Sequence, residues 1–300
     1  MKPVTKIIFT DDNGIKFFGE GPFRLLCSVE KTGSLRAAAM EMEMAYSKAS
    51  KLLKQAEANL GFPLTIRSAG GKDGGGSILT PEGKRWLRQY EAYRDACVEA
   101  NQSLYRQFFP KLGCVIMASG LGKRFGGNKL MADFHGRPMI LRALDATEGL
   151  FSHRVVVTRH ESIADLCREQ NVDVVLHDLP NRNDTVRLGL EALGDLDCCM
   201  FLPGDQPLLR RETVAMLLES WKENPDRIIR PVYEDTVGSP VLFPSWAFPE
   251  LKSLPEGKGG SVVIKNHPHE IMHVSVPNPF ELMDADTPET LELLKGLYHD

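Results

Sequence analysis

Short apolar runs separated by amphipathic segments are the feature that most restricts the fold of this chain. After Pro110 such runs occur at residues 114–117, 155–157, 172–176, 198–202, 228–231 and 272–276. A strand that is apolar on both faces belongs to a sheet with helices on both sides, and this alternation is typical of a largely parallel sheet. We therefore expect residues 111–300 to form an α/β, Rossmann-like domain with helices on both faces of the sheet.

Residues 1–110 follow a different pattern and are expected to form a separate domain. Between residues 23 and 105, apolar side chains recur at the helical spacing of three and four. Ser34 can cap one helix, and a second is expected from about Ala45 to Leu60, before Gly61. Residues 62–67 and 78–79 then suggest a hairpin with a glycine-rich flexible tip, followed by a long helix capped by Thr80. This order predicts a winged helix-turn-helix.

The second of these helices has the composition of a DNA-contacting helix. Lys48 and Lys51 lie along it, with Tyr46 and Ser47 near its start, and such side chains contact phosphates and base edges in a major groove. Residues 1–110 hold 16 basic and 12 acidic residues, whereas residues 111–300 hold 20 and 28. The basic surplus favours a polyanionic partner for the first domain alone. The alternative is a winged helix that serves only interaction or dimerisation.

Residues 21–93 resemble the DNA-binding domain of the molybdate-responsive transcriptional regulators, a winged helix also related to the LysR type. The resemblance is carried by Gly33 and Ser34, by three alanines at 37–39, by Tyr46, and by a wing from Arg67 to the sequence LTPEG at 79–83. It implies DNA binding as a homodimer, and it adds Arg67 to the candidate DNA-binding residues.

A loop of small residues follows the first apolar run of the second domain, with the sequence ASGLGKRFGGNK at 118–129. Backbone N–H groups in such a loop approach phosphate oxygens closely, and Lys123, Arg124 and Lys129 add positive charge. The loop is not a P-loop, because Asn128 precedes Lys129 and Leu130 replaces the hydroxyl residue. The predicted nucleotide-binding residues here are Ala118, Ser119, Gly120, Gly122, Arg124 and Lys129.

The second domain resembles the nucleotidyltransferase family that attaches nucleotides to molybdopterin. The loop matches its opening motif at 118–120, 124, 126 and 128–130, and LPGDQP at 202–207 matches its second motif, in which an aspartate binds Mg²⁺. Further matches lie at 185–189, 238–240, 257–260 and 284–289, so the resemblance covers nearly all of residues 113–295. It implies Mg²⁺-dependent nucleotidyl transfer to molybdopterin.

Nucleotidyl transfer brings two anions together and needs cations for the leaving pyrophosphate, together with carboxylates to hold a metal ion. Asp205 ends an apolar strand, where a metal ligand projects into the crevice of an α/β sheet, although it could instead cap the next helix. Asp286, or else Asp284, is the second candidate ligand, and the alternative for Asp286 is the N-cap of the final helix. Lys129 and Arg124 are expected to hold the β- and γ-phosphates.

Arg187 is expected either to assist nucleotide binding or to lie on a helix surface. The choice of nucleotide depends on residues 118–120, because the resemblance associates AGG with guanylyl transfer and AAG with cytidylyl transfer. Ser119 is small but not glycine, which favours CTP over GTP. Sugar phosphates and polyol phosphates remain alternative acceptors, and a regulator that only senses nucleotide or pterin is the alternative to an enzyme.

The cellular setting is inferred from what the sequence lacks. No run of eighteen apolar residues and no apolar leader is present, so we expect a cytoplasmic protein without a membrane partner. The remaining expected partner is a molybdoenzyme that receives the product.

Overall fold

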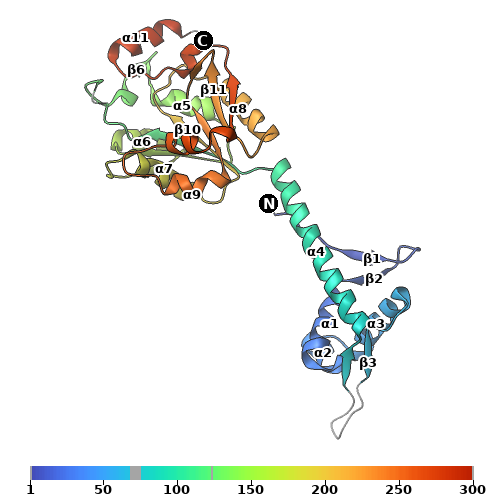
Figure 1. Ribbon diagram of the computed structural model, residues 1–300. Helices are drawn as coiled ribbons and strands as arrows, with labels where there is room; N and C mark the ends of the chain where they lie inside the picture. The colour runs from blue at the N-terminus through green and yellow to red at the C-terminus, as the bar shows by residue number, and fades with distance from the viewer. Residues whose placement is uncertain (1, 68–75, 123, 299–300) are drawn as a thin grey trace. The chain divides into compact units, whose positions relative to one another are not determined.

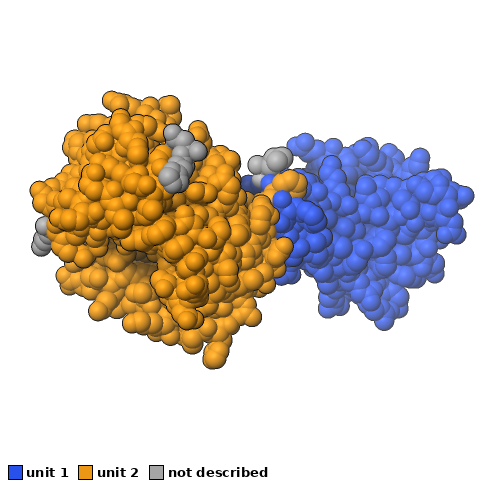
Figure 2. Space-filling view, turned by 90° about the horizontal axis from the view of Figure 1, so that it is seen from above, with its two compact units in different colours: residues 1–108 blue, residues 109–300 orange. Residues whose placement is uncertain are grey.

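A computed structural model describes residues 2–67, 76–122 and 124–298. The chain divides into two compact units, residues 1–108 and 109–300 (Figure 2). Lys123 and most of the predicted wing tip, residues 68–75, lie outside the described residues.

The first unit contains the predicted winged helix-turn-helix. In chain order its elements are β1 (Ile8–Thr10), β2 (Lys16–Gly19), α1 (Glu20–Thr32), α2 (Leu35–Glu41), α3 (Tyr46–Leu60), β3 (Thr65–Arg67), β4 (Ser77–Leu79) and α4 (Pro81–Phe108). Strands β3 and β4 pair as the antiparallel wing, and Phe18, Leu25, Leu53 and Leu87 lie in one core with the helices. The β1–β2 hairpin has no counterpart in the sequence prediction.

Local chemistry explains the boundaries of these helices. The Ser34 hydroxyl accepts the N–H of Ala37 and caps α2, whereas α3 ends where Gly61 adopts a left-handed φ of 77°. The Thr80 hydroxyl caps α4 by accepting the N–H of Gly83 at 2.8 Å. A Cβ on Gly83 would lie 2.3 Å from the Leu64 carbonyl oxygen, so α4 packs against the wing only with glycine there.

The second unit is built on an eight-stranded, mostly parallel sheet (Figure 1). Its strands are β5 (Leu112–Ala118), β8 (His153–Thr158), β9 (Asp173–Leu176), β10 (Cys198–Pro203), β11 (Ile228–Tyr233), β12 (Thr236–Val237), β13 (Val241–Pro244) and β14 (Ile271–Ser275). The order is β12-β11-β13-β10-β5-β8-β9, with β14 beside β11. The parallel pairs are β10–β5, β5–β8, β8–β9 and β11–β14.

Helices cover both faces of this sheet, as the sequence predicted. One core contains side chains of α5 (Ile140–Thr147), α6 (Glu161–Glu169), α8 (Arg211–Glu223) and α11 (Pro288–Leu297). The other contains side chains of α7 (Arg182–Leu193), α9 (Phe248–Lys252) and α10 (Ser261–Asn266). A small hairpin of β6 (Asp133–Phe134) and β7 (Arg137–Pro138) precedes α5. Within the described residues, no helix has the length and apolar character needed to span a membrane.

Candidate active site

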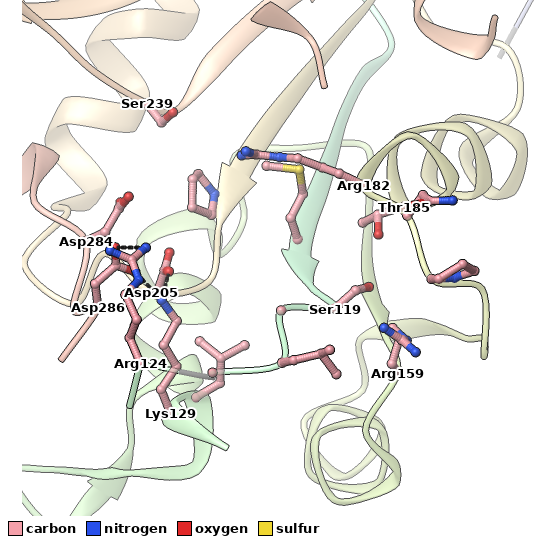
Figure 3. A pocket seen from close by; sticks show the side chains of 18 residues that line it. Ser119, Arg124, Lys129, Arg159, Arg182, Thr185, Asp205, Ser239, Asp284 and Asp286 are labelled. Atoms are coloured by element: carbon pink, nitrogen blue, oxygen red, sulfur yellow. Dashed lines mark hydrogen bonds and ion pairs between the residues drawn. The ribbon is translucent and has the colours of Figure 1, made fainter. Parts of the chain in front are cut away.

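A pocket of about 560 Å³ lies at the carboxyl ends of β5 and β10 (Figure 3). This is the edge of an open α/β sheet where ligands generally bind. The predicted residues that line it are Ser119, Gly120, Gly122, Arg124, Lys129, Asp205 and Asp286, together with the alternative ligand Asp284. The sequence analysis did not select Arg159, Asn181 or Arg182, which also line the pocket, as does Ser239 from the matched motif at 238–240.

Gly122 makes the loop after β5 sterically possible. Its φ is +58°, and an added Cβ would lie 2.0 Å from the carbonyl oxygen of Gly127. The Gly122 carbonyl accepts the N–H of Phe125 at 2.9 Å and that of Gly126 at 3.0 Å. The loop therefore turns tightly on Gly122 before the short 3-10 helix η1 (Lys129–Met131), which begins with the predicted lysine.

Lys129 lies between two carboxylates. Its ammonium group donates to Asp205 and to Oδ1 of Asp286, the latter at 2.8 Å, and only 12% of its side chain is exposed. Burial would lower the pKa of Lys129, but the charge and hydrogen bond of Asp205, with those of Asp286, outweigh it and raise the pKa. Lys129 is therefore fully charged at neutral pH.

Arg124 and Asp284 complete this charged cluster. A guanidinium nitrogen of Arg124 lies 2.8 Å from Oδ2 of Asp286. The hydrogen bond from Lys129 lowers the pKa of Asp286, whereas burial and the charge of Asp205 raise that of Asp284. Contact with cations therefore makes Asp286 easier to ionise, whereas burial makes Asp284 harder to ionise.

Neither predicted metal ligand caps a helix. Helix α8 begins after Arg210 without a side-chain cap, and α11 is capped by Thr287, whose hydroxyl accepts the N–H of Thr290 at 3.2 Å. The capping alternatives for Asp205 and Asp286 are therefore wrong. The two segments are held together by the backbone, since the N–H of Ala285 donates to the Asp205 carbonyl at 2.8 Å.

The Ser119 hydroxyl contacts two groups of the protein itself. It lies 3.1 Å from the Val157 carbonyl oxygen and 2.9 Å from Nε2 of His177. Burial and then the charge of Arg159 lower the pKa of His177, so the imidazole is neutral at pH 7. A hydroxyl has one proton, and both of these partners are protein atoms. A nucleobase could therefore only donate a hydrogen bond to the Ser119 oxygen.

Two predicted nucleotide-binding residues lie elsewhere. Ala118 is fully buried in β5, and its carbonyl accepts the Thr158 hydroxyl at 3.0 Å. Arg187 does not line the pocket, because it forms ion pairs along its own helix with Asp184 at 3.7 Å and Glu191 at 3.0 Å. Arg187 therefore lies on the surface of its helix, which was the alternative prediction for this residue.

The predicted DNA-contacting residues are accessible. Tyr46, Ser47, Lys48, Lys51 and Arg67 are all exposed. The opposite face of α3 is buried through Ala49, Leu53 and Ala56. Helix α3 thus packs with its apolar face on the core and its basic face free.

A family model for the MobA-like NTP transferase domain matches residues 114–271, which is more than half of the chain. The chain belongs to this family. A second model, for bacterial regulatory helix-turn-helix proteins of the lysR family, matches residues 22–84. The protein thus joins a helix-turn-helix domain to a nucleotidyltransferase domain.

Several curated relatives that match part of the chain are named as nucleotidyltransferases. The chain is 30% identical to a probable molybdenum cofactor guanylyltransferase of Aquifex aeolicus over 112 residues, which are 37% of this chain and 54% of that protein. It is 32% identical to 3-deoxy-manno-octulosonate cytidylyltransferase of Acinetobacter baumannii over 118 residues, 37% of this chain and 46% of the relative. The chain thus spans about half the length of these relatives.

Solved structures support the fold. A nucleotidyl transferase from Methanothermobacter thermautotroptrophicus is 18% identical with a TM-score of 0.53, over 62% of this chain and 97% of that one. Rv0371c from Mycobacterium tuberculosis, crystallised with manganese, is 20% identical with a TM-score of 0.51, over 63% of this chain and all of that one. At these identities the likeness establishes the nucleotidyltransferase fold alone.

Proposed function

We propose that residues 109–300 catalyse metal-dependent transfer of a cytidylyl group from CTP to molybdopterin. A phosphate oxygen of the acceptor attacks the α-phosphorus, the bond from that phosphorus to the bridging oxygen breaks, and pyrophosphate leaves. The observation that carries the proposal is the cluster of Lys129, Arg124, Asp205 and Asp286 beside a small-residue loop in one pocket. These are the cations and carboxylates that the reaction requires.

Asp205 and Asp286 are the proposed Mg²⁺ ligands. Mg²⁺ prefers oxygen ligands and is commonly held by one or two carboxylates together with substrate phosphates. Among the described residues, no group of three or more His, Cys, Asp or Glu side chains forms a complete metal cage. A pair of carboxylates completed by the triphosphate fits this arrangement. When bound, the ion would neutralise charge on the departing pyrophosphate.

Lys129 and Arg124 are the proposed phosphate-binding cations, with Ser119, Gly120 and Gly122 supplying the loop beneath the nucleotide. Both cations reach the pocket from this loop, and both now pair with carboxylates. An arriving triphosphate would exchange these carboxylates for phosphate oxygens. Their position supports a role for Lys129 and Arg124 as catalytic residues that stabilise the leaving group.

Ser119 supports CTP over GTP. Its side chain is anchored to Val157 and His177, so it adds volume at the position where the resemblance associates glycine with guanylyl transfer. The relatives include a guanylyltransferase and several cytidylyltransferases, so the two nucleotides must be compared directly.

The test is a pyrophosphate-release assay with the full chain, Mg²⁺, molybdopterin and each NTP separately. We expect CTP to give the highest kcat/KM, and Asp205→Ala to reduce it by at least about a hundredfold, as loss of a major transition-state contact does. Asp165→Asn on the exposed face of α6 is the matched control. Pyrophosphate release that is absent with every NTP, or undiminished in Asp205→Ala, would reject catalysis and leave the sensing role.

The first unit is proposed to bind DNA through α3 and the wing. Exposed Tyr46, Ser47, Lys48, Lys51 and Arg67 support this role. Lys48→Ala with Lys51→Ala should weaken binding to promoter DNA and reduce its dependence on salt by about two phosphate contacts. Lys84→Ala with Arg88→Ala on α4 is the control pair. If the wild-type chain binds no DNA even at low salt, the unit is an interaction module instead.

We also propose a cytoplasmic homodimer that passes its product to a molybdoenzyme. Tyr93 and Leu104 are each 52% exposed on α4, which leaves apolar surface for a second copy. Sedimentation of the full chain with and without Leu104→Glu tests the dimer. A monomeric wild type would exclude it.

A further inference from the structure

We propose that Arg182, with Ser239, binds the phosphate group of the acceptor. This inference rests on the proposed function, because it divides one pocket between the nucleotide and the second anion of nucleotidyl transfer. The acceptor of the proposed reaction carries a phosphate group, and recognition of this group is here assigned to Arg182, which lies outside the motifs that carry the family resemblance.

The first observation is an imbalance of charge within the pocket. Lys129 and Arg124 already pair with carboxylates. Arg159 and Arg182 also line the pocket, yet within the described parts of the chain neither guanidinium makes an ion pair or a side-chain hydrogen bond. Unpaired arginines in a ligand pocket are suited to bidentate recognition of phosphate.

The second observation separates these two arginines. Arg159 acts on His177, which contacts Ser119, so it belongs to the end of the pocket next to the loop. Figure 3 shows Arg182 entering from the other wall, with its guanidinium directed across the pocket toward the side where Ser239 and Asp205 lie. Arg182 therefore faces the proposed reaction centre from the side opposite the loop.

The stem of Arg182, an exposed residue, lies against a neighbouring loop. An added Cβ on Gly259 would lie 3.2 Å from both Cδ and Nε of Arg182, so the loop at 257–260 passes directly against its stem. That loop is anchored to the start of α7, because the N–H of Gly257 donates to Asn183 at 2.9 Å and the Asn181 amide donates to Glu256 at 3.0 Å. The glycine-rich motif thus shapes the position of Arg182.

The location of Arg182 has an electrostatic cost without a ligand. It is the first residue of α7, at the positive end of the helix dipole, where a cation is unfavourable. The acidic residue of this first turn, Asp184, accepts the N–H of Asn181 and pairs with Arg187 instead. A bound phosphate would meet both the guanidinium and the helix end. The Ser239 hydroxyl, which makes no hydrogen bond among the described residues, adds a donor opposite.

The test separates acceptor binding from nucleotide binding by steady-state kinetics on the full chain. Arg182→Ala should raise the KM for molybdopterin about ten- to a hundredfold, the size expected for a lost charged hydrogen bond, with the KM for CTP changed less than twofold. Arg182→Lys should recover part of this loss. Gly259→Ala should produce a smaller rise of the same kind, since it displaces the arginine without removing it. Arg187→Ala, five residues further along α7 and outside the pocket, is the control.

A rise in the KM for CTP equal to or larger than that for molybdopterin would place Arg182 on the nucleotide and overturn the proposal, as would no change in either KM. Calorimetric titration of inorganic phosphate into the CTP-saturated chain gives a readout that needs no turnover. Phosphate binding weakened by Arg182→Ala supports the subsite even if no NTP yields pyrophosphate. Equal phosphate binding by wild type and Arg182→Ala refutes it even if transfer is observed.

Discussion

Replacing Lys129 by methionine should tighten metal binding to the free protein while it abolishes nucleotidyl transfer. In the wild-type chain the ammonium group lies between Asp205 and Asp286, where a divalent cation would bind the same carboxylates. A metal ion must therefore either remain next to this positive charge or displace it from its ion pairs. Methionine keeps much of the side-chain volume and removes the charge.

The size of the effect follows from Coulomb's law. Two unit charges about 4 Å apart repel by about 1 kcal/mol in water, so a divalent ion beside the ammonium group costs about 2 kcal/mol even with full solvent screening. Since about 1.4 kcal/mol corresponds to a factor of ten, we expect Lys129→Met to bind Mn²⁺ at least about thirtyfold more tightly than wild type. Lys129 is only 12% exposed, so screening is incomplete and this is a lower bound.

Two measurements on nucleotide-free protein check the prediction. Calorimetric titration with Mn²⁺ gives the affinity directly. Thermal unfolding should show Lys129→Met melting below wild type without metal, because two carboxylates lose their shared cation, and regaining more stability than wild type when Mn²⁺ is added. Lys222→Met, which removes a surface ion pair with Glu219, is the control. Equal Mn²⁺ affinity in wild type and Lys129→Met would refute the view that lysine and metal compete for one site.

Three further substitutions test the packing and ionisation of the domain. Burial raises the pKa of Asp284 above the unfolded value of 3.8, so its ionisation costs stability at pH 7 and nothing at pH 3. Asp284→Asn should therefore raise the melting temperature by on the order of 2 °C at pH 7 alone. An equal gain at pH 3 would contradict this. Gly189→Ala places a Cβ 2.6 Å from both γ-carbons of Val115 and should lower the free energy of unfolding by about 1–3 kcal/mol in denaturant titrations. Gly296→Ala is the control, because the space around Gly296 is open and its replacement should not destabilise the protein. In Gly122→Ala, the new Cβ would lie 2.0 Å from a carbonyl oxygen of the same loop. This substitution should raise the KM for CTP at least about tenfold with little loss of melting temperature. An unchanged KM would show that the loop does not hold the nucleotide.

The sequence predicted those parts of the fold that depend on local pattern. The strands β5, β8, β9, β10, β11 and β14 all correspond to apolar runs, and β5 and β10 at the centre of the sheet are buried along nearly all of their length. Strand β13 was missed, because its apolar run is only Val241–Phe243 and it lies between Pro240 and Pro244, which are typical of turns. The β1–β2 hairpin was missed because its strands are short and partly exposed.

The sequence predicted those site residues that a motif and the chemistry of the reaction both indicate. It missed the arginine whose position depends on which side of a helix faces the pocket. Lys129, Asp205 and Asp286 were selected by residue type and by their places in the matched motifs, Asp205 also by its position at a strand end, and they do meet in the pocket. Arg187 was selected from a motif on α7, whereas Arg182 was not. Five residues along an α-helix correspond to a rotation of about 140°, so the two arginines point to different sides of the helix. The sequence offered no means of choosing between them without knowing which side faces the sheet edge.

The pairing of Lys129 in the free protein bears on whether this domain catalyses or only senses. A sensor gains affinity from an unpaired cation, because a lysine that must first leave two carboxylates contributes less to binding a phosphate. Lys129 has two carboxylate partners, Asp205 and Asp286. Such a lysine can exchange partners as charge moves to the leaving group and return to them when pyrophosphate departs, which favours turnover over retention. Among the described residues, Arg159 and Arg182 have no ion-pair partner, so the pocket combines two cations that are paired with carboxylates and two that can bind a further anion, as a reaction between two anions requires.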